Sequence, residues 1–389
     1  MDTKAAARER LEAQRATLVA LSHRIHAHPE LGYEETRASG WLAETLRAGG
    51  MAVETGVCDL PTAFSARAGS GPLQLVICAE YDALPGIGHA CGHNLIAAMG
   101  AGAGLALAPL ADDLGLTVTV LGTPAEEIGN AAGKVLLLER GAFDGTHAAM
   151  MVHPAPHDSV TPKLIAGAQF IIRYIGKSAH AAATPELGVN AADALTIAQV
   201  AIGLLRQHIR SSDRIHGIVT DGGDAPNIIP AHSAARYIIR SDTFAELNEL
   251  IPRVMRCFEA GALATGATLE VSGGDKPYAH LDQDAEMAAL YRANGEALGR
   301  VFTSQPVVAS TDMGNVSLVI PTIHPMIGID SLPAVNHQPE FTTACATPTA
   351  DQAIFDGALA MAWTAIDLAT TDALRQRLLA KAYSAAPVG

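Results

Sequence analysis

Residues suited to metal chemistry lie close together in the stretch GHACGHN, between Gly88 and Asn94, which follows a run of strand-forming residues. Cys91 and His93 are two positions apart in it, close enough to reach one metal region. Thiolate and imidazole are ligands that zinc prefers, while imidazole together with carboxylate also accommodates manganese and cobalt. A single Cys/His pair is more often structural than catalytic, so a catalytic interpretation needs support from other parts of the chain.

Two adjacent glutamates, Glu126 and Glu127, follow the next apolar segment, which ends near Gly122. Adjacent side chains of an extended turn point in different directions, so one carboxylate can bind a metal while its neighbour faces a reacting water molecule. The alternative is a solvated acidic pair at a helix N-terminus, where the helix dipole favours negative charge. The pair alone supports both interpretations equally.

A histidine, His153, closes a third apolar segment in MMVHPAP, and the prolines after it prevent the strand from continuing. The usual alternative is a histidine whose ring is satisfied inside the core. However, the three polar clusters follow three successive strands, and the carboxyl ends of parallel strands share one edge of a sheet. Their common position therefore favours a single catalytic site.

The segments around these residues alternate between strands and helices after an N-terminal helix. Strands are expected at LQLVICAE (73–80), LTVTVLGT (116–123) and HAAMMVH (147–153), with helices at 94–108, 131–140 and 349–369. This order predicts an α/β fold in which a mostly parallel sheet is flanked by helices.

A different pattern begins near residue 165. Strands are expected at 168–176, 214–223, 232–242 and 267–274, with helices at 190–209 and 244–265. The order strand, helix, two strands, helix, strand is that of a ferredoxin-like α+β module. We therefore expect a catalytic domain of residues 1–164 and 277–389, interrupted by an inserted domain of residues 165–276.

Composition and charge exclude several classes of protein. A chain of 389 residues with 49% apolar content is long enough for two domains. The net charge of −14, without a basic tract, argues against a nucleic-acid partner. The apolar run 95–111 is diluted by glycines and Pro109, so we expect a buried helix and no membrane partner. The charged N-terminus does not resemble a signal peptide, so we expect a cytoplasmic location. Five scattered cysteines make a disulfide framework improbable.

Two other enzyme classes fit the motifs poorly. The stretch GIGHACG spaces its glycines as GxGxxxG, one residue too long for a dinucleotide fingerprint, and Cys91 stands where the third glycine belongs. A GxSxG nucleophile elbow is also missing from the sequence, which disfavours a serine hydrolase of the α/β type.

Taken together, the motifs resemble the aminoacylase/carboxypeptidase family of dinuclear metal-dependent amidohydrolases. The resemblance is strongest to the branch that contains aminobenzoyl-glutamate hydrolase, hippurate hydrolase and the indole-acetyl-amino-acid hydrolases. It spans nearly the whole chain in the family's order, through HAHPELGYEE (26–35), AEYDALPGIGHACGHN (79–94), GTPAEEIGNAAGK (122–134), MMVHPAP (150–156), GKSAHAAATPELGVNAADAL (176–195), NIIPAHSAARYIIRSD (227–242), STDMGNVS (310–317) and VNHQPEF (335–341).

The resemblance implies a catalytic domain like that of the zinc exopeptidases and a role for each matching residue. The ligands of two divalent ions, manganese, zinc or cobalt, would be Cys91, His93, Glu127, His153 and His337. Glu126 matches the general acid/base, and Asp82 matches the aspartate that orients a ligand histidine. Glu80 stands where the carboxypeptidases proper carry a ligand histidine, so the implied metal set is that of the Cys-containing branch.

The inserted domain would then serve as lid and dimer interface of a homodimer. His180 matches a donor to the oxyanion that reaches the site from the other subunit, and Asn227 and Arg240 match residues that hold a substrate carboxylate. The other histidines considered are not interpreted as ligands. His26 and His28 are interpreted as structural, and His89, His147, His157 and His324 as structural or as contacts of the ligand residues.

The implied activity is hydrolysis of the amide bond of N-acyl amino acids, aminobenzoyl-glutamate-like conjugates or small dipeptides. A dipeptidase or carboxypeptidase of the same family is the alternative. A non-catalytic binding relative is a further alternative, but it would be expected to lack Glu126 or several ligands, and the sequence retains them.

Overall fold

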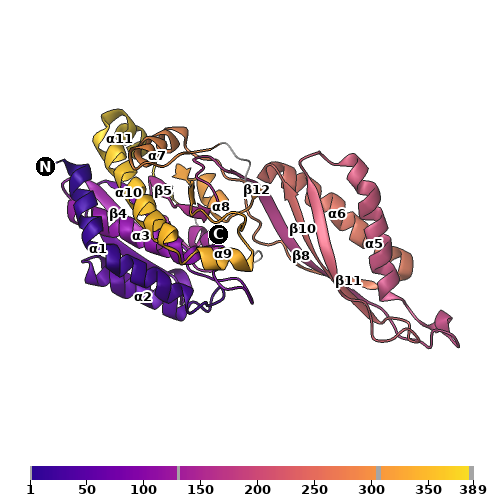
Figure 1. Ribbon diagram of the computed structural model, residues 1–389. Coiled ribbons are helices and arrows are strands. Elements are labelled where there is room, and N and C mark those ends of the chain that lie inside the picture. The colour runs from indigo at the N-terminus through magenta and orange to yellow at the C-terminus, as the bar shows by residue number, and fades with distance from the viewer. Residues whose placement is uncertain (1, 129–131, 304–307, 385–389) are drawn as a thin grey trace. The chain divides into compact units, whose positions relative to one another are not determined.

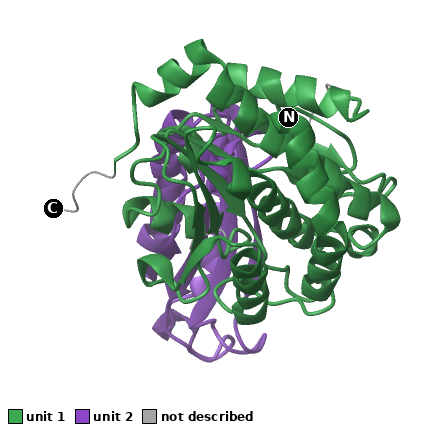
Figure 2. Ribbon diagram, turned by 90° about the vertical axis from the view of Figure 1, so that its left-hand side faces the viewer, with its two compact units in different colours: residues 1–163, 281–308, 315–389 green, residues 164–280, 309–314 purple. Residues whose placement is uncertain are grey.

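The computed structural model describes residues 2–128, 132–303 and 308–384, and the chain divides into two compact units (Figure 2). Unit 1 comprises residues 1–163, 281–308 and 315–389, and unit 2 comprises residues 164–280 and 309–314. The sequence analysis assigned residues 164, 277–280 and 309–314 to the catalytic domain. They belong to unit 2 because Tyr278 exchanges backbone hydrogen bonds of 2.8 and 3.0 Å with Gly167, and because the Ile165 N–H donates to the Ala309 carbonyl.

The central sheet of unit 1 has the strand order β1-β2-β4-β3-β5-β13. Its strands are β1 (Ala52–Thr55), β2 (Phe64–Ala68), β3 (Leu73–Ala79), β4 (Leu116–Gly122), β5 (Ala148–Met150) and β13 (Thr322–Ile323). The neighbours from β4 to β13 are parallel, and only the β1 and β2 end is antiparallel. The mostly parallel sheet flanked by helices, predicted from the alternation of strands and helices, is confirmed (Figure 1).

Helices form the rest of unit 1: α1 (Thr3–His26), α2 (Thr36–Ala48), α3 (His93–Leu107), α4 (Gly133–Glu139), α7 (Ala285–Ala297), α9 (Pro339–Ala344), α10 (Pro348–Thr370) and α11 (Asp372–Leu379). The short helix α8 (Met313–Ser317) crosses the boundary between the units. The predicted helix at 131–140 appears as α4, and its first residue, Ala131, lies outside the described residues.

Helix α3 forms the core of unit 1, because each of its residues is buried. It packs against α1, α10 and the sheet, and a Cβ at Gly104 would lie only 2.3 Å from Val120 Cγ2, so glycine permits the close approach. The segment 93–110 and α10 are each long and apolar enough to cross a membrane, but they are 83% and 89% buried inside the protein. Their apolar character is thus explained by core packing, as predicted for the run at 95–111.

One predicted strand is divided. The segment 147–153 was expected to be a single strand that His153 closes, but β5 ends at Met150 and His153 instead begins β6 (His153–Ala155), which pairs in parallel with β14 (Met326–Gly328). Pro325, between β13 and β14, carries no N–H to donate, so the parallel ladder is interrupted there. A further two-stranded ladder joins β7 (Lys163–Leu164) to β12 (Val308–Ala309).

Unit 2 has the predicted order of strands and helices. Its elements are β8 (Ala166–Ile175), α5 (Ala191–Leu205), β9 (Arg214–Asp221), β10 (His232–Ser241), α6 (Phe244–Thr265) and β11 (Thr268–Gly273). The sheet order is β11-β8-β10-β9 with antiparallel neighbours, as in a ferredoxin-like module, and α5 and α6 cover one of its faces (Figure 1). Sequence-encoded caps start both helices: Asn190 accepts from the first turn of α5, and Thr243 forms a capping box with Glu246 on α6.

Candidate metal centre

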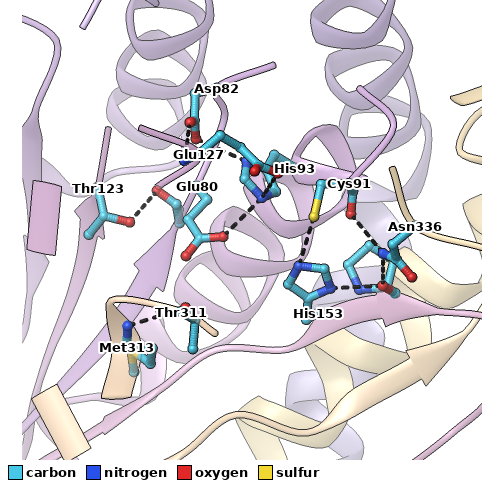
Figure 3. Close-up of polar contacts among 12 residues, drawn as sticks. Glu80, Asp82, Cys91, His93, Thr123, Glu127, His153, Thr311, Met313 and Asn336 are labelled. Carbon is cyan, nitrogen blue, oxygen red and sulfur yellow. Dashed lines mark hydrogen bonds and ion pairs between the residues drawn. The ribbon is translucent and has the colours of Figure 1, made fainter. Parts of the chain in front are cut away.

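The loop after β3 brings Cys91 and His93 to the carboxyl edge of the sheet, at the N-terminus of α3. Gly92, between them, has a φ of 83°, and a Cβ there would lie 2.4 Å from Pro154 Cγ. Because only glycine adopts this backbone easily and leaves room for the proline, the turn depends on Gly92. The turn directs the cysteine and the histidine toward a common region (Figure 3).

Potential ligand atoms from separate segments converge there within 4.8 Å of one another. Three overlapping groups form in unit 1, namely Cys91, His93 and His153; Cys91, Glu127 and His337; and His93, Glu126 and Glu127. The structure therefore brings together every residue predicted to bind metal, with the predicted acid/base Glu126 beside them.

Hydrogen bonds orient two of the histidine rings. The Nδ1 of His93 lies 2.9 Å from Asp82 Oδ1, and Asp82 Oδ2 accepts the Glu127 backbone N–H at 2.9 Å (Figure 3). His153 Nδ1 donates to the Pro154 carbonyl at 2.8 Å. Since Nδ1 is engaged in each ring, Nε2 is left to face the cluster, as is usual for metal-binding histidines.

The inner atoms of the cluster are those that a metal would satisfy. The buried His93 Nε2 and Glu127 Oε1 have no hydrogen-bond partner among the described residues. They lie 3.8 Å apart, Glu127 Oε1 lies 3.4 Å from His337 Nε2, and His153 Nε2 lies 3.4 Å from Cys91 Sγ. A set of one thiol, imidazoles and carboxylates, with its lone pairs facing inward, fits zinc, cobalt or manganese.

Burial and neighbouring charges oppose the metal-binding forms of Cys91 and His93 but favour the neutral form of His153. Burial, and then the charge of Glu127, raise the pKa of the Cys91 thiol well above its ordinary value. Burial, and then the neighbouring His93, lower the pKa of His153 to about 4. Burial opposes protonation of His93, but Asp82 and Cys91 raise its pKa above the ordinary value. A bound cation would instead stabilise the thiolate and the carboxylates, which couples metal binding to proton release.

The segment around His337 is tied to the other ligand segments. His337 has a φ of 69°, its side chain is largely exposed, and its backbone N–H donates to the Ala90 carbonyl at 2.8 Å. The neighbouring Asn336 donates from Nδ2 to the carbonyls of Pro154 at 3.1 Å and Cys91 at 3.4 Å (Figure 3). Asn336 thus holds three ligand segments together. The sequence analysis missed it, although its position beside His337 in VNHQPEF was a signal.

A buried ion pair lies beside the cluster. Glu80 and Lys134 are both fully buried, and Lys134 Nζ lies 2.5 Å from Glu80 Oε1, while Glu80 Oε2 lies 3.4 Å from His93 Nε2. Burial would raise the pKa of Glu80, but Lys134 and His93 lower it to about 2. Sequence reasoning noted Glu80 only as a departure from the carboxypeptidases and overlooked Lys134, a lone lysine in the apolar helix α4.

The histidines that were not interpreted as ligands do not join the cluster. In the described part of the chain, no potential metal-binding group contains His26, His28, His89, His147, His157 or His324. His26 Nε2 contacts the Thr342 carbonyl, and His28 Nδ1 contacts the Arg24 carbonyl. His324 is fully buried and stacks on His153 with ring centroids 5.5 Å apart.

In unit 2, the predicted lid residues lie at different ends of the sheet. His180 forms a bridge with Ile228, and the Ala181 N–H donates to the Asn227 carbonyl, so the segments of His180 and Asn227 lie together. They lie at the end of the sheet where β10 begins with His232. Arg240 lies near the far end of β10, opposite Gly167, where its guanidinium donates to Ser310 Oγ at 2.7 Å. His232 and Arg240 are separated by about 26 Å of strand. Asn227 and Arg240 of one chain therefore do not converge on one carboxylate.

Comparison with known proteins identifies the family. Residues 76–351 match the model of Peptidase family M20/M25/M40. The chain belongs to this family. Relatives include the Xaa-Arg dipeptidase of Mus musculus, 39% identical over 95% of this chain and 90% of the relative. They also include a p-aminobenzoyl-glutamate hydrolase protein of Escherichia coli, 30% identical over 78% of this chain and 69% of the relative.

Solved structures share the fold. A dinuclear metal-binding peptidase of the M20 family from Bacillus subtilis superposes with a TM-score of 0.69 at 20% identity, covering 92% of this chain and 99% of the other. Further relatives are an N-acetyl-L-cysteine deacetylase and an IAA-amino acid hydrolase. The family predicted from the motifs is confirmed: the protein is an M20 metallopeptidase acting on amide bonds, an amidohydrolase or dipeptidase.

Proposed function

We propose that the protein hydrolyses the amide bond of a small dipeptide with two divalent metal ions, of zinc, manganese or cobalt, and with Glu126 as general acid/base. The observation that carries the proposal is the convergence of ligand atoms whose inner ends, His93 Nε2 and Glu127 Oε1, lack hydrogen-bond partners among the described residues. The ligands would be Cys91, His93, Glu127, His153 and His337.

In this mechanism the two adjacent glutamates have different tasks. Bound divalent ions supply Lewis acidity, which lowers the pKa of water toward about 7. Glu126 accepts the proton of the attacking water and then delivers it to the departing amide nitrogen, so one carboxylate serves both steps. Glu127 is held by its backbone N–H to Asp82, which also fixes the ring of His93, so Asp82 orients two ligands at once.

We infer that the preferred substrates are dipeptides with a basic C-terminal residue. Two relatives covering 95% and 90% of this chain, each 39% identical, are named Xaa-Arg dipeptidases. The net charge of −14 would attract a cationic substrate. Aminobenzoyl-glutamate conjugates are the second candidate, supported by the Escherichia coli relative.

We further propose a homodimer in which unit 2 supplies residues to the site of a second copy. The separation of Asn227 from Arg240 along one sheet supports this arrangement, because a carboxylate held by both would need one residue from each chain. Edge strand β9 exposes Ile218 and Val219, and α5 exposes Val200 and Leu204, so unit 2 carries exposed apolar side chains on an edge strand and on a helix. His180 would then donate to the oxyanion in the partner's site, an interaction worth about 3–4 kcal/mol of barrier.

Substrate profiling tests the activity. Protein loaded with zinc, manganese or cobalt would be assayed on dipeptides ending in arginine or lysine, on the amides of the same dipeptides, on aminobenzoyl-glutamate and on N-acetyl amino acids. The proposal expects the highest kcat/KM for the basic dipeptides with a free carboxylate. Equal rates on the dipeptides and their amides would exclude a site that binds the substrate carboxylate. A preference for aminobenzoyl-glutamate would favour aminobenzoyl-glutamate conjugates as the substrates.

Complementation tests the dimer. Chains carrying His180→Ala and chains carrying Glu126→Gln should each be inactive, and mixed dimers should regain part of the activity because one site then has both residues. Light scattering would establish the dimer, and differently tagged chains would report subunit exchange. Absence of recovery after demonstrated exchange would exclude a role for His180 across subunits.

A further inference from the structure

The turn that carries the two glutamates has an unusual backbone. Ala125, directly before Glu126, is fully buried and has a φ of 58°. For a residue with a Cβ this left-handed conformation costs about 1–2 kcal/mol, so neighbouring groups must hold it. The direction of the Glu126 side chain depends on this conformation, since a change of φ at Ala125 would rotate the chain that follows.

Two buried carboxylates hold alternate backbone amides of the turn. Glu35 Oε1 accepts the Ala125 N–H at 2.8 Å, and Asp82 Oδ2 accepts the Glu127 N–H at 2.9 Å. Glu35 and Asp82 are 0% and 1% exposed. Hydrogen bonds from amides to buried carboxylates are stronger than those between neutral groups, so the amides on both sides of Glu126 are fixed.

The loop that contains Glu35 also packs directly against the turn. A Cβ at Gly32 would lie 2.9 Å from Ala125 Cα, so the loop and the turn are in close contact at a position that requires glycine. In addition, the Glu30 carbonyl accepts the N–H of Ala83, the residue after Asp82, at 2.8 Å. The segment HAHPELGYEE, which carries no ligand, therefore contacts both chain segments that orient the glutamates.

We propose that Glu35 is a positioning residue whose carboxylate holds the Ala125–Glu127 turn in the conformation that directs Glu126 toward the reacting water. The inference rests on the proposed function in treating Glu126 as the acid/base. It assigns a task to a buried acidic residue that touches neither a predicted metal ligand side chain nor substrate.

The required property of Glu35 is an acceptor oxygen, not a charge. Burial, and then the nearby Asp82 carboxylate, raise the pKa of Glu35 to about 7, so at neutral pH the carboxyl group is present in both protonation states. Either state leaves Oε1 able to accept the Ala125 N–H. Glutamine offers the same acceptor at the same position.

Three variants separate positioning from general stability. Glu35→Met keeps the volume and removes the acceptor, Glu35→Gln keeps both, and Glu30→Met is the matched control. The Glu30 carboxylate also accepts backbone N–H groups, those of Arg37 and Ala38 at the start of α2, but it does not contact the turn. Glu35→Met should lower kcat about 10- to 100-fold, the range for a misdirected catalytic group, with KM and metal content nearly unchanged.

Glu35→Gln should restore kcat to near the wild-type value, and Glu30→Met should lower thermal stability without lowering kcat. The inference is overturned if Glu35→Met retains wild-type kcat, if Glu35→Gln loses as much kcat as Glu35→Met, or if Glu30→Met loses equally.

Amide hydrogen exchange provides a readout independent of activity. In Glu35→Met, exchange should accelerate in the segment containing Ala125, whereas in Glu30→Met it should accelerate at the start of α2. Unchanged exchange at Ala125 in Glu35→Met would overturn the positioning role. If exchange at Ala125 accelerates in Glu35→Met while a Glu126→Gln variant is fully active, the positioning role of Glu35 is supported and the proposed function of Glu126 is rejected.

Discussion

Replacing Lys134 by methionine should destabilise the protein far more than removing an ordinary lysine. Lys134 and Glu80 are both fully buried, so Lys134→Met leaves the Glu80 carboxylate in the interior without its nearest cation. Removing one partner of a buried ion pair costs about 3–5 kcal/mol, although the intact pair contributes little compared with apolar residues. The cost arises from the stranded charge and not from the contact itself.

The pKa of Glu80 also reflects its dependence on Lys134. The ordinary value of 4.5 falls to about 2 in the folded protein, where Lys134 is the largest cause that lowers it against the effect of burial. Because the folded pKa is depressed, the stabilisation is present above pH 4.5 and is lost as the pH falls toward 2. The folded protein therefore favours the charged carboxylate, and much of this preference depends on the ammonium.

Chemical denaturation at pH 7 after chelator treatment would measure the loss. The control is Lys4→Met, because Lys4 pairs with Asp367 at 2.7 Å but its side chain is 31% exposed, so about 1 kcal/mol or less should be lost. The double variant with Glu80→Gln and Lys134→Met should recover part of the stability, since no charge is then stranded. A loss below 1 kcal/mol for Lys134→Met, or a double variant less stable than Lys134→Met, would refute this reasoning.

The other predictions concern the site itself. Glu126→Gln should lower kcat by about 10²–10⁴-fold with metal content intact, whereas Glu127→Gln should weaken metal binding as measured by elemental analysis; the reverse pattern would exchange their roles. Chelators should abolish activity, and manganese, cobalt or zinc should restore it with up to two ions per chain; full activity of metal-free protein would contradict the mechanism. The folded pKa of Glu35 is raised from 4.5 to about 7, so the unfolded chain releases this proton at a lower pH than the folded protein does. The Glu35 carboxyl group therefore lowers the free energy of unfolding as the pH rises between these values. Glu35→Gln should therefore gain up to about 3 kcal/mol relative to wild type between pH 4.5 and 8, measured by denaturation.

Local sequence patterns predicted much of the fold. The mostly apolar segments of β3 and β4, separated by the helix α3, indicate a buried parallel sheet because both faces of such strands are covered. The α6 boundaries, Phe244–Thr265, were predicted from the sequence, and in the structure Thr243 with Glu246 caps the start and Gly266 the end. The predicted ligands also converge: Cys91, His93 and Glu127 follow β3 and β4 at one edge of the sheet, His153 begins β6, and His337 lies in the loop before α9.

Contacts between distant segments were beyond sequence reasoning. The anchor from Glu35 to Ala125 joins residues 90 positions apart, and no local pattern near either residue signals it. The positive φ of Ala125 was equally hidden, because alanine is not a residue that marks a left-handed turn. The break between Met150 and His153 depends on Pro325, which lies between β13 and β14, in a segment that the chain reaches much later.

Charge balance connects the buried ion pair with the number of metal ions proposed. Four carboxylates, those of Glu80, Asp82, Glu126 and Glu127, lie at or beside the cluster and are buried or nearly so. A ligand thiolate at Cys91 adds a fifth negative charge, and Lys134 supplies one positive charge. With neutral histidines the balance is about four negative charges, which one divalent ion would neutralise only by half. Two divalent ions would neutralise these four charges, so the charge balance favours two ions. Lys134 neutralises the carboxylate of Glu80, which is not among the predicted ligands.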